Sequence, residues 1–469
     1  SYNTPIYGTR NGETPSDPMW LEDGSWNRDL IKLDDRNPLL SQEYNYKKEN
    51  ITRMLNSMFA SFEIYKDMVL KSTFSYDFVS GKGKSWHDPR TSDGGNGKNG
   101  SFGKSNTETT KMNWNMVLSY LYHFKSGHNL DALVGYEVER KDTDYLSARR
   151  SNFARPDKVD LNTGMKLEGA SGNVSGTRMI SYLTRLNYDF KSKYYAGASW
   201  RTDGSSRLSR DNRWGHFWSL SGAWRVSAEK FMEATSSWLT DMKLRLSYGV
   251  NGTLPSGYYP YQALSSLTSS YDDQPGILQS QIENNELTWE SNHNFNAGLD
   301  LSFLDNRISL TLEYYRRTTK DLLYARPLSI TTGFSSYLAN IGKMRNEGVE
   351  LELSTLNFES KNFSWTTSLN LSHNRNKILR LDGELSEVIS NPFIRKVGKS
   401  YYTFYLIEFA GINPENGMPQ FYSNKRDENG NLQRDLVYDP NDAERVELGA
   451  AEPKLTGSIG NYFRYRWFD

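Results

Sequence analysis

Apolar residues occupy every second position in a series of short segments along most of this chain. In one segment Met68, Leu70, Phe74, Tyr76 and Phe78 alternate with polar residues, and the same alternation covers 112–124. Successive side chains of a β-strand point to opposite faces of a sheet. Each segment is therefore predicted to be a strand with one apolar face and one polar face.

The predicted strands fall into pairs that are joined alternately by short and long connections. The pairs are 52–62 with 68–79, 111–124 with 129–140, 179–190 with 194–202, 216–226 with 241–250, 292–303 with 308–317 and 348–357 with 363–373, and a thirteenth strand lies near 456–468. Most links within a pair are short and polar, whereas the links between pairs run over 80–110, 141–178, 251–291, 318–347 and 374–455. Outer-membrane barrels have short periplasmic turns and long extracellular loops. This regularity favours a barrel over a soluble two-sheet sandwich, which has no reason to keep its long loops at one end.

The hydropathy of the chain agrees with strands that cross a membrane. No run of about 20 apolar residues, the length that a membrane helix needs, is present. The mean hydropathy is -0.72, which fits a barrel with a polar interior and large hydrated loops. Lipid tolerates closed β-barrels because every backbone N–H and C=O group in them is paired. The predicted fold class is therefore all-β, a transmembrane antiparallel β-barrel.

Aromatic residues border the short links of the predicted strand pairs. Barrels carry such residues as girdles at the two membrane–water interfaces. In a soluble two-sheet protein the same residues would be ordinary core aromatics. The predicted girdle consists of Phe124, Tyr188, Phe190, Tyr194, Tyr195, Phe303, Phe358 and Phe363.

The number of predicted strands indicates a barrel that this chain does not complete. Thirteen is odd, whereas single-chain bacterial barrels have an even number of strands, and lipid does not tolerate an open sheet edge. We therefore expect partner strands outside both ends of the chain. In this division 1–50 is a lead-in or extracellular-loop segment and 51–469 is the barrel portion.

Two of the long connections have features of their own. The glycine-rich stretch 92–100 is predicted to be a flexible loop tip. Within 374–455, Phe404–Ile412 and Gln420–Tyr422 are expected to form a small hairpin outside the membrane, and Asn416-Gly417 and Asn429-Gly430 are predicted tight turns.

Charge and cysteine content exclude several classes of protein. The 56 lysine and arginine residues balance 56 aspartate and glutamate residues, so no bulk charge favours a nucleic acid as partner. The absence of cysteine excludes disulfides and thiolate metal sites. The first residues, from Ser1 to Pro5, lack the pattern of a signal peptide. Such a peptide was removed, or the chain begins partway through a larger protein.

The residues show no catalytic constellation. Gly83-Lys84-Ser85 and Gly103-Lys104-Ser105 lack the glycine five residues earlier that a phosphate-binding loop needs. The six histidines are scattered, and no Gly-x-Ser-x-Gly motif is present. Asp203, Asp211 and 427–431 could ligate calcium but lack the spacing of an EF-hand. We predict no enzyme activity and no catalytic, cofactor or metal-binding residue, and calcium in the loops or in a partner is left open.

Seven motifs follow one another in a fixed order. They are Tyr194–Leu208, Trp214–Arg225, Leu244–Gly249, Leu287–Glu290, Asn296–Asp300, Asn346–Leu351 and Glu452–Gly457. Each motif is weak alone, but the ordered set resembles the barrel of SusC/RagA-type TonB-dependent transporters. Residues 1–178 resemble this family more loosely.

The resemblance implies a plugged barrel of roughly 22 strands in the outer membrane of a Bacteroidetes-like bacterium. It implies TonB-dependent import of a glycan, an oligosaccharide or an oligopeptide, with a SusD-like surface lipoprotein as a lid. Energy would come from TonB–ExbB–ExbD through an N-terminal region, and the plug domain is absent from this chain. Outer-membrane lipid is a further partner, and a dimer of the SusC–SusD pairs is left open.

Other functions remain as alternatives. Among barrels these are a siderophore or vitamin receptor of the TonB-dependent type and a passive porin. In other classes they are an outer-membrane hydrolase and a soluble sugar-binding β-protein.

The predicted contacts to substrate or lid are loop aromatics, because aromatic faces are able to stack on sugar rings or pack against a protein. These aromatics are Trp214, Tyr258, Tyr259 and Trp289. The other motif residues are expected to be structural. They are Arg201, Asp203, Gly204, Ser205, Ser206, Arg207, Trp214, Gly215, Trp224, Arg225, Gly348, Glu350, Pro453 and Lys454.

Overall fold

The computed structural model describes residues 18, 20–25, 27, 38–95, 97–272, 274–381 and 386–468. Most of the lead-in segment expected at 1–50 lies outside these residues. Its described end forms helix α2 (Pro38–Tyr44) and the first residues of β1 (Tyr46–Tyr65). Among the described residues, no helix is long and apolar enough to cross a membrane.

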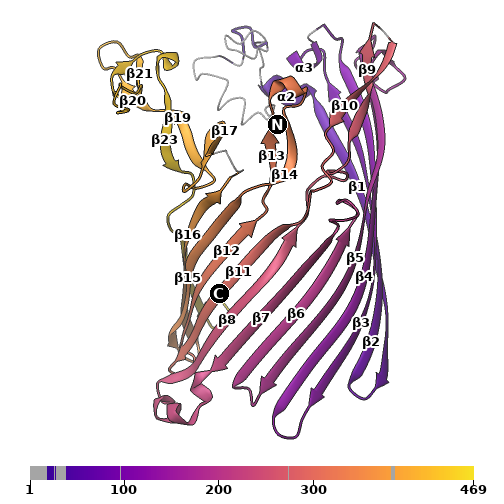
Figure 1. The fold of residues 1–469 in the computed structure, drawn as a ribbon. Helices are drawn as coiled ribbons and strands as arrows, with labels where there is room; N and C mark the ends of the chain where they lie inside the picture. Colours follow the sequence, from indigo (N-terminus) through magenta and orange to yellow (C-terminus); the bar gives the residue numbers. More distant parts are fainter. Residues whose placement is uncertain are drawn as a thin grey trace. The chain divides into compact units, whose positions relative to one another are not determined.

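Thirteen strands form one sheet, and this number confirms the prediction from the alternating pattern. Their order is β1-β2-β3-β4-β5-β6-β7-β8-β11-β12-β15-β16-β24 (Figure 1). The other twelve bounds are β2 (Met68–His87), β3 (Ser101–His123), β4 (His128–Phe153), β5 (Gly164–Phe190), β6 (Tyr194–Ser205), β7 (Trp214–Arg225), β8 (Leu239–Thr253), β11 (Glu290–Phe303), β12 (Ile308–Lys320), β15 (Lys343–Glu359), β16 (Phe363–Arg380) and β24 (Thr456–Tyr465). Among the described strands, β1 and β24 each pair with one neighbour, so these strands do not close on themselves.

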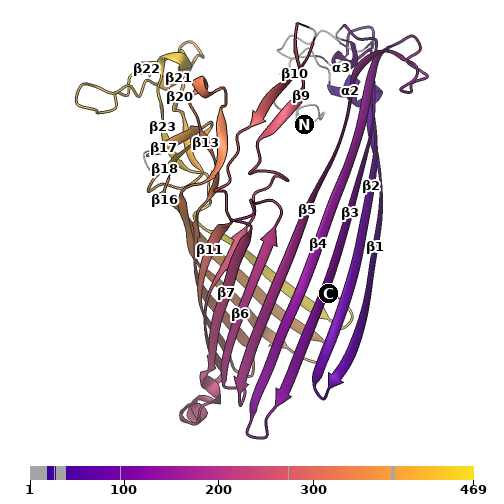
Figure 2. The same ribbon diagram turned by 45° about the vertical axis from the view of Figure 1, so that its right-hand side comes forward.

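Short links join the strands at one end of the sheet. The two-residue turn 66–67 and the links 124–127, 191–193, 304–307 and 360–362 all lie there. The link from β7 to β8 is longer and carries two 3-10 helices, η1 (Val226–Ala228) and η2 (Lys230–Thr235), at the lower end of the strands in Figure 2. The predicted alternation of short and long connections is confirmed.

Several strands extend further toward the long connections than the sequence indicates. The predicted strands 111–124, 129–140 and 179–190 lie within longer strands, β3, β4 and β5, of 23, 26 and 27 residues. The added residues are mainly polar on both faces of the strand, so their sequence shows no alternation of apolar and polar positions. Backbone hydrogen bonds continue the sheet there without that alternation. The connections 80–110 and 141–178 consequently shrink to 88–100 and 154–163. The first contains the predicted glycine-rich tip and a short helix, α3 (Ser92–Gly95).

The chain divides into two compact units. Unit 1, residues 1–61, 71–116 and 137–179, contains a core of Trp86, Phe102 and Phe153. The Trp86 and Phe153 rings meet edge to face with centroids 5.2 Å apart. Unit 2, residues 62–70, 117–136 and 180–469, contains a core of Leu208, Leu287 and Trp289.

Within unit 2, the register assigns a chemical character to each face of the sheet. Trp218, Leu220 and Trp224 on β7 share a face with Val250, Tyr248 and Leu244 on β8, which lie directly opposite them. This apolar face is open, with 56% exposure at Leu220 and 58% at Leu246. The alternate positions, including Ser199, Ser219, Ser221 and Ser247, form the polar face. A sheet that exposes such rows of apolar side chains on one face is typical of a wall that contacts lipid.

Aromatic rings form a chain of contacts on the apolar face near the short links. Centroid distances are 6.5 Å for Phe124–His128, 4.3 Å for His128–Phe190 and 6.4 Å for Phe190–Tyr194. The chain continues from Tyr194 to Trp224 at 6.5 Å. This is the girdle expected for Phe124, Phe190 and Tyr194.

Tyr195 is an exception to the predicted girdle. It follows Tyr194 directly, so strand alternation turns its side chain to the polar face, where the Lys243 ammonium lies 4.7 Å from its ring centroid. The prediction for Tyr195 is therefore wrong.

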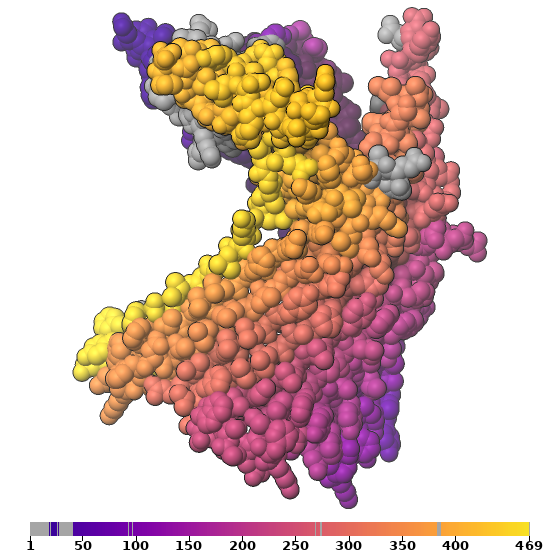
Figure 3. All heavy atoms as spheres, turned by 60° about the vertical axis from the view of Figure 1, so that its left-hand side comes forward, coloured from indigo at the N-terminus to yellow at the C-terminus, as the bar shows by residue number. Residues whose placement is uncertain are grey.

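Smaller sheets occupy the long connections. A hairpin of β9 (Leu264–Tyr271) and β10 (Gln274–Gln281) precedes β11, and β13 (Leu323–Pro327), η3 (Ile330–Thr332) and β14 (Ser336–Asn340) precede β15. After β16, the chain forms β17 (Glu387–Ser390), β18 (Phe393–Lys396), β19 (Thr403–Ile407), β20 (Phe409–Ile412), β21 (Pro419–Tyr422), β22 (Leu436–Val437), η4 (Pro440–Asp442) and β23 (Arg445–Ala450). These last elements, orange to yellow in Figure 3, project beyond the loop end of β16.

The hairpin predicted within 374–455 is present in part. Phe409 on β20 lies opposite Phe421 on β21, whereas β19 pairs with β18 and β23 instead. The two predicted tight turns are confirmed by positive φ angles of 69° at Gly417 and 81° at Gly430. Glycine adopts such angles without strain.

Candidate functional site

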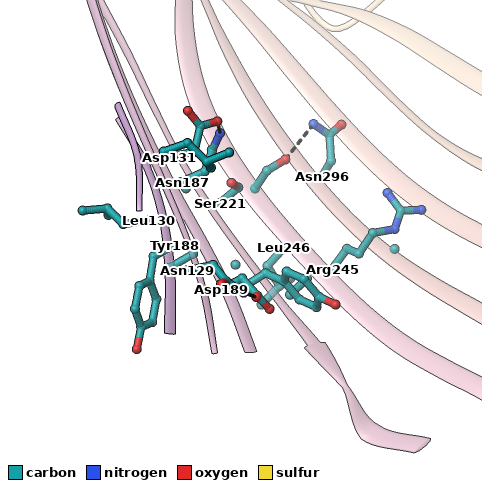
Figure 4. Close-up of a pocket in the computed structure, with 18 residues that line it drawn as sticks. Asn129, Leu130, Asp131, Asn187, Tyr188, Asp189, Ser221, Arg245, Leu246 and Asn296 are labelled. Carbon is teal, nitrogen blue, oxygen red and sulfur yellow. Dashed lines mark hydrogen bonds between the residues drawn. The ribbon is translucent and has the colours of Figure 1, made fainter. Parts of the chain in front are cut away.

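The polar face of unit 2 is hollowed near the short-link end of the strands. The hollow has a volume of about 420 Å³ and is bordered by β3, β4, β5, β6, β7, β8 and β11. Asp131, Asn187, Ser221, Arg245 and Asn296 line it from five of these strands (Figure 4). Leu130 and Tyr188 are neighbours of these residues along the chain and point away from Asp131 and Asn187 (Figure 4).

Small residues make the hollow possible. A Cβ atom at Gly197 would lie 2.6 Å from Ser221 Oγ and 3.2 Å from Asn187 Oδ1. These distances are shorter than ordinary van der Waals contact, so a larger residue at this position would displace the Ser221 hydroxyl. Two residues further along β6, the hydroxyl of Ser199 shares a 2.6 Å hydrogen bond with that of Ser219, which lies opposite it on β7.

Hydrogen bonds across the strands hold the polar side chains in place. Asn187 Nδ2 donates to Asp131 Oδ2 at 3.2 Å, and Asn129 donates to Asp189. Asn296 Nδ2 donates to Ser247 Oγ at 3.3 Å (Figure 4). Because each pair joins two neighbouring strands, these donors and acceptors are held at fixed positions along the lining.

Arg245 is the central cation of this face. Its guanidinium donates to both carboxylate oxygens of Asp300, at 2.7 and 3.0 Å, and lies 3.7 Å from Glu313 Oε2. A Cβ atom at Gly298, directly opposite Arg245, would lie 2.8 Å from Arg245 Nη2. The glycine therefore leaves the space through which arginine reaches the next strand.

Tyr315 makes the same kind of crossing on the neighbouring strands. It lies opposite Gly348, which lies opposite Asn374 on the other side. The Tyr315 hydroxyl crosses this glycine and donates to Asn374 Oδ1 at 2.9 Å. The polar face has a second hollow of about 470 Å³, which is lined by Glu313, Glu350 and other residues of this face.

The arrangement can bind a polar solute but shows no reaction centre. It offers amide, hydroxyl, guanidinium and carboxylate groups of both hydrogen-bonding types. Among the described residues, no three histidine, aspartate or glutamate side chains gather as metal ligands.

The predicted contact Trp289 lies inside the loop core of unit 2. It is 9% exposed, packs with Leu208 and Leu287, and meets Phe217 edge to face at 5.3 Å. Its indole N–H donates to the Arg213 carbonyl at 3.0 Å. Little of the ring is therefore open to a ligand in this arrangement.

The other three predicted contacts are more open. Trp214 begins β7 on the apolar face, where its ring covers Gly204 and stacks with Tyr182 at a centroid distance of 6.3 Å. Tyr258 and Tyr259 lie in the connection after β8 with ring centroids 6.4 Å apart, and Tyr259 is 37% exposed. Trp214, Tyr258 and Tyr259 thus remain predicted contacts, and the two tyrosines are the ones that lie in a loop.

The motif residues expected to be structural make internal contacts. Arg201 donates to Asp203 at 2.7 Å and to Ser181 at 2.9 Å, and Arg207 donates to the Pro255 carbonyl at 3.0 Å. Buried Ser205 accepts a hydrogen bond from the backbone N–H of Arg207, and Ser206 follows in the same loop. Gly204 and Gly215 lie under the rings of Trp214 and Phe217, respectively.

The remaining motif residues contact neighbouring strands or links. Trp224 donates to Glu229 at 3.2 Å, and Arg225 donates to Asp241 at 2.7 Å. Glu350 accepts from Ser372 at 3.4 Å, and His373 Nδ1 contacts the carbonyl oxygen of Lys454, which follows Pro453.

Arg245, Asn296 and Asp300 are not among the site residues predicted from the sequence, although all three lie in the ordered motifs. Their signal was available, because each occupies a polar position of an alternating strand. What the sequence does not show is that the register brings Arg245 beside Gly298 and Asp300.

Comparisons with known proteins agree with this architecture. The family described as TonB dependent receptor-like, beta-barrel, matches residues 1–467. TonB-dependent receptor P3 of Formosa agariphila is 30% identical over 96% of this chain and 47% of its own length. TonB-dependent receptor SusC of Bacteroides thetaiotaomicron is 28% identical over 82% of this chain and 40% of its own length.

A solved structure has the same fold. The RagAB peptide importer in its closed-closed state superimposes with a TM-score of 0.81 and 26% identity, over 95% of this chain and 50% of that chain. The chain thus spans about half the length of the P3 receptor and of the RagAB chain. The sheet is the wall of an outer-membrane β-barrel, and the chain belongs to the TonB-dependent receptor-like β-barrel family.

Proposed function

We propose that this chain is part of the wall of an importer that takes up a polar nutrient, an oligosaccharide or an oligopeptide, with energy from TonB. The observation that carries the proposal is the polar face of β4–β16. This face offers hydrogen-bond donors and acceptors from several strands, and it carries the ion pair of Arg245 with Asp300. The opposite face carries rows of exposed apolar side chains, so the polar face is the one that lines the interior.

The surface suits an uncharged or zwitterionic chain of repeated polar units. Sugars and peptides both present many hydroxyl, carbonyl or amide groups, and the two hollows offer partners of both hydrogen-bonding types. The similar RagAB structure is that of a peptide importer, which supports the oligopeptide. The oligosaccharide rests on the resemblance to the SusC/RagA family.

A SusD-like lipoprotein is the proposed lid. The segment after β16 exposes apolar side chains outside the wall, with 57% exposure at Phe409 and 63% at Ile412. Tyr259, in the connection after β8, adds an open aromatic ring. In the proposed cycle the lid captures the nutrient, the nutrient binds above a plug domain in the complete protein, and TonB displaces the plug.

The test is uptake by the source bacterium with and without the complete protein. Cells would receive labelled oligosaccharides, labelled oligopeptides or a ferric siderophore, each with intact and deleted TonB. We expect uptake of one of the first two classes, lost on deletion of either the transporter or TonB. Uptake that persists without TonB would instead indicate a passive channel. Uptake of the siderophore alone would also contradict the proposal.

A further inference from the structure

The apolar face of β12, β15 and β16 changes from apolar to cationic at one level across all three strands. Cross-strand rows near the short links are Leu310–Leu353–Leu369 and Leu312–Leu351–Leu371. Toward the loop end the next rows are Tyr314–Val349–His373 and Arg316–Glu347–Arg375, followed by Thr318–Arg345–Lys377 and the pair Lys320–Lys343. The β12–β15 register is unbroken through these rows, and the β15–β16 register is unbroken up to its shift between Met344 and Lys343. All of these side chains therefore share the face that contacts lipid.

Six cations therefore gather at the loop-side border of the apolar rows. We call Arg316, Lys320, Lys343, Arg345, Arg375 and Lys377 the cationic patch. Among the described residues, Glu347 is the only carboxylate within ion-pair distance of any of them, at 3.8 Å from both Arg316 and Arg345. Most of the positive charge of the patch is thus uncompensated by the described part of the protein.

The placement of the cations costs stability in the absence of a counter-ion. Arg345 lies directly opposite Lys377, and Lys320 lies directly opposite Lys343. Like charges in such cross-strand positions repel each other. The Arg345 Nε atom is also buried without a hydrogen-bond partner among the described residues. An anion bound at this level would relieve the repulsion.

The patch is a local feature and does not encircle the wall. Toward the loop end of β6, β7 and β8, the same face carries Trp200, Trp218, Tyr248 and Val250. Aromatic residues are the usual interfacial side chains of a barrel. The concentration of arginine and lysine on β12, β15 and β16 therefore requires a separate explanation.

We propose that the cationic patch binds the phosphate groups of a phosphorylated lipid of the outer leaflet. The leucine rows beneath the patch would contact the acyl chains of the same molecule. Arginine binds phosphate through two parallel N–H groups, and lysine adds a compact charge. Four residues of a strand span about 13 Å, so the patch from Arg316 to Lys320 covers the depth of a headgroup. The proposal depends on the membrane location of the wall and not on the imported substrate.

The test uses the complete protein, purified from outer membranes in mild detergent, and native mass spectrometry. The probes are phosphorylated lipopolysaccharide, the same lipopolysaccharide after removal of its phosphates, and inorganic phosphate. The test variant is Lys320→Gln/Lys343→Gln/Lys377→Gln. The matched control is Lys66→Gln/Lys125→Gln/Lys361→Gln, which removes three exposed lysines from the short links. Heat-dependent electrophoretic mobility would show that each variant is folded.

We expect wild type and control to bind phosphorylated lipopolysaccharide equally and the test variant to bind it roughly 100-fold more weakly, since each interfacial cation contributes about fivefold. Removal of the lipid phosphates should weaken binding by wild type to a similar degree. Equal binding by the folded test variant would overturn the proposal. Competition by millimolar inorganic phosphate as strong as that by the lipid would show a free-phosphate site and would also contradict it.

Discussion

The Arg245 guanidinium crosses Gly298 on the neighbouring strand and forms a two-pronged ion pair with Asp300. The Tyr315 side chain crosses Gly348 in the same way to reach Asn374. In both cases a strand glycine lies between a long side chain and its partner. These side chains bond to neighbouring strands on the polar face. Gly298 and Gly348, which both lie in the ordered motifs, leave the space that the crossing side chains occupy.

Substitution of Gly348 is expected to be severe. A Cβ atom there would lie 2.3 Å from the His373 carbonyl oxygen and 2.6 Å from the Tyr315 hydroxyl. Because the carbonyl belongs to the backbone of β16, it cannot move without disturbing the ladder. We expect Gly348→Ala to lower the free energy of unfolding of the complete protein by about 2–3 kcal/mol, measured by urea titration in lipid vesicles.

Gly222→Ala provides the matched control for this prediction. The nearest atom to its Cβ would be the Tyr195 carbonyl oxygen at 3.8 Å, an ordinary contact. A stability equal to that of wild type is expected for this control. Equal stabilities of the Gly348 and Gly222 variants would show that the crossing has no steric importance.

Removal of Arg245 should destabilise the wall more than neutralisation of Asp300. Arg245→Met leaves Asp300 and Glu313 on adjacent strands without their shared cation, whereas Asp300→Asn leaves Arg245 within 3.7 Å of Glu313. Both side chains are partly exposed, so the difference between the two unfolding free energies should be only about 1 kcal/mol. The measurement is the same urea titration at low and high salt.

Salt provides the internal check on the Arg245 prediction. Repulsion between the two carboxylates is screened as ionic strength rises. The difference between the two variants should therefore shrink in about 1 M salt. A difference that is independent of salt would point to lost packing of the arginine stem instead of charge.

The sequence predicts the strands of the wall better than the contacts between them. Alternation identified all thirteen strands because lipid on one face and polar groups on the other impose a strict period of two. It failed beyond the apolar rows, where β3, β4 and β5 continue with polar residues on both faces. The roles of Gly298 and Gly348 depend on which residue lies opposite each of them on the neighbouring strand. The sequence of one strand does not determine this register.

The loop aromatics show a second limit of prediction from sequence. Trp289 and Tyr259 both lie in the long polar connection between β8 and β11, so their local sequences do not distinguish them. The structure separates them, because Leu208 and Leu287 cover Trp289 whereas Tyr259 stays open. Burial within a loop depends on residues from other connections, which the alternating pattern does not reveal.

The difference in burial between Trp289 and Tyr259 predicts different effects of their substitution on stability. Trp289→Ala should cost about 3–5 kcal/mol of local stability, because it removes a large buried side chain and its hydrogen bond to the Arg213 carbonyl. Tyr259→Ala should leave stability unchanged. Hydrogen exchange of peptides covering 203–213 is the measurement, and faster exchange is expected only in the Trp289 variant.

Uptake by the two variants tests the predicted contact role of the aromatics. If Tyr259 contacts substrate or lid, Tyr259→Ala should raise the half-saturating concentration for uptake without faster exchange. Trp289→Phe, which keeps a ring and loses the N–H donor, should show a milder exchange effect of about 1 kcal/mol. Unchanged uptake by Tyr259→Ala would remove this residue from the set of contacts.

Acid should loosen the connection between β2 and β3 through Asp88. Burial raises the pKa of the Asp88 carboxyl, but hydrogen bonds from the Arg90 side chain and backbone outweigh it, so the pKa lies below its ordinary value of 3.8. A carboxyl with a lowered pKa stabilises the folded state fully above its unfolded pKa, and this stabilisation is lost as pH falls through the folded pKa. We therefore expect faster hydrogen exchange over 88–95 below about pH 4, after correction for the intrinsic rate, and no change between about pH 5 and 8.

Asp88→Asn should show the faster exchange at every pH, whereas Asp157→Asn, which alters an exposed ion pair with Arg155, should match wild type. Acid-induced loosening that persists unchanged in Asp88→Asn would assign the effect to another group.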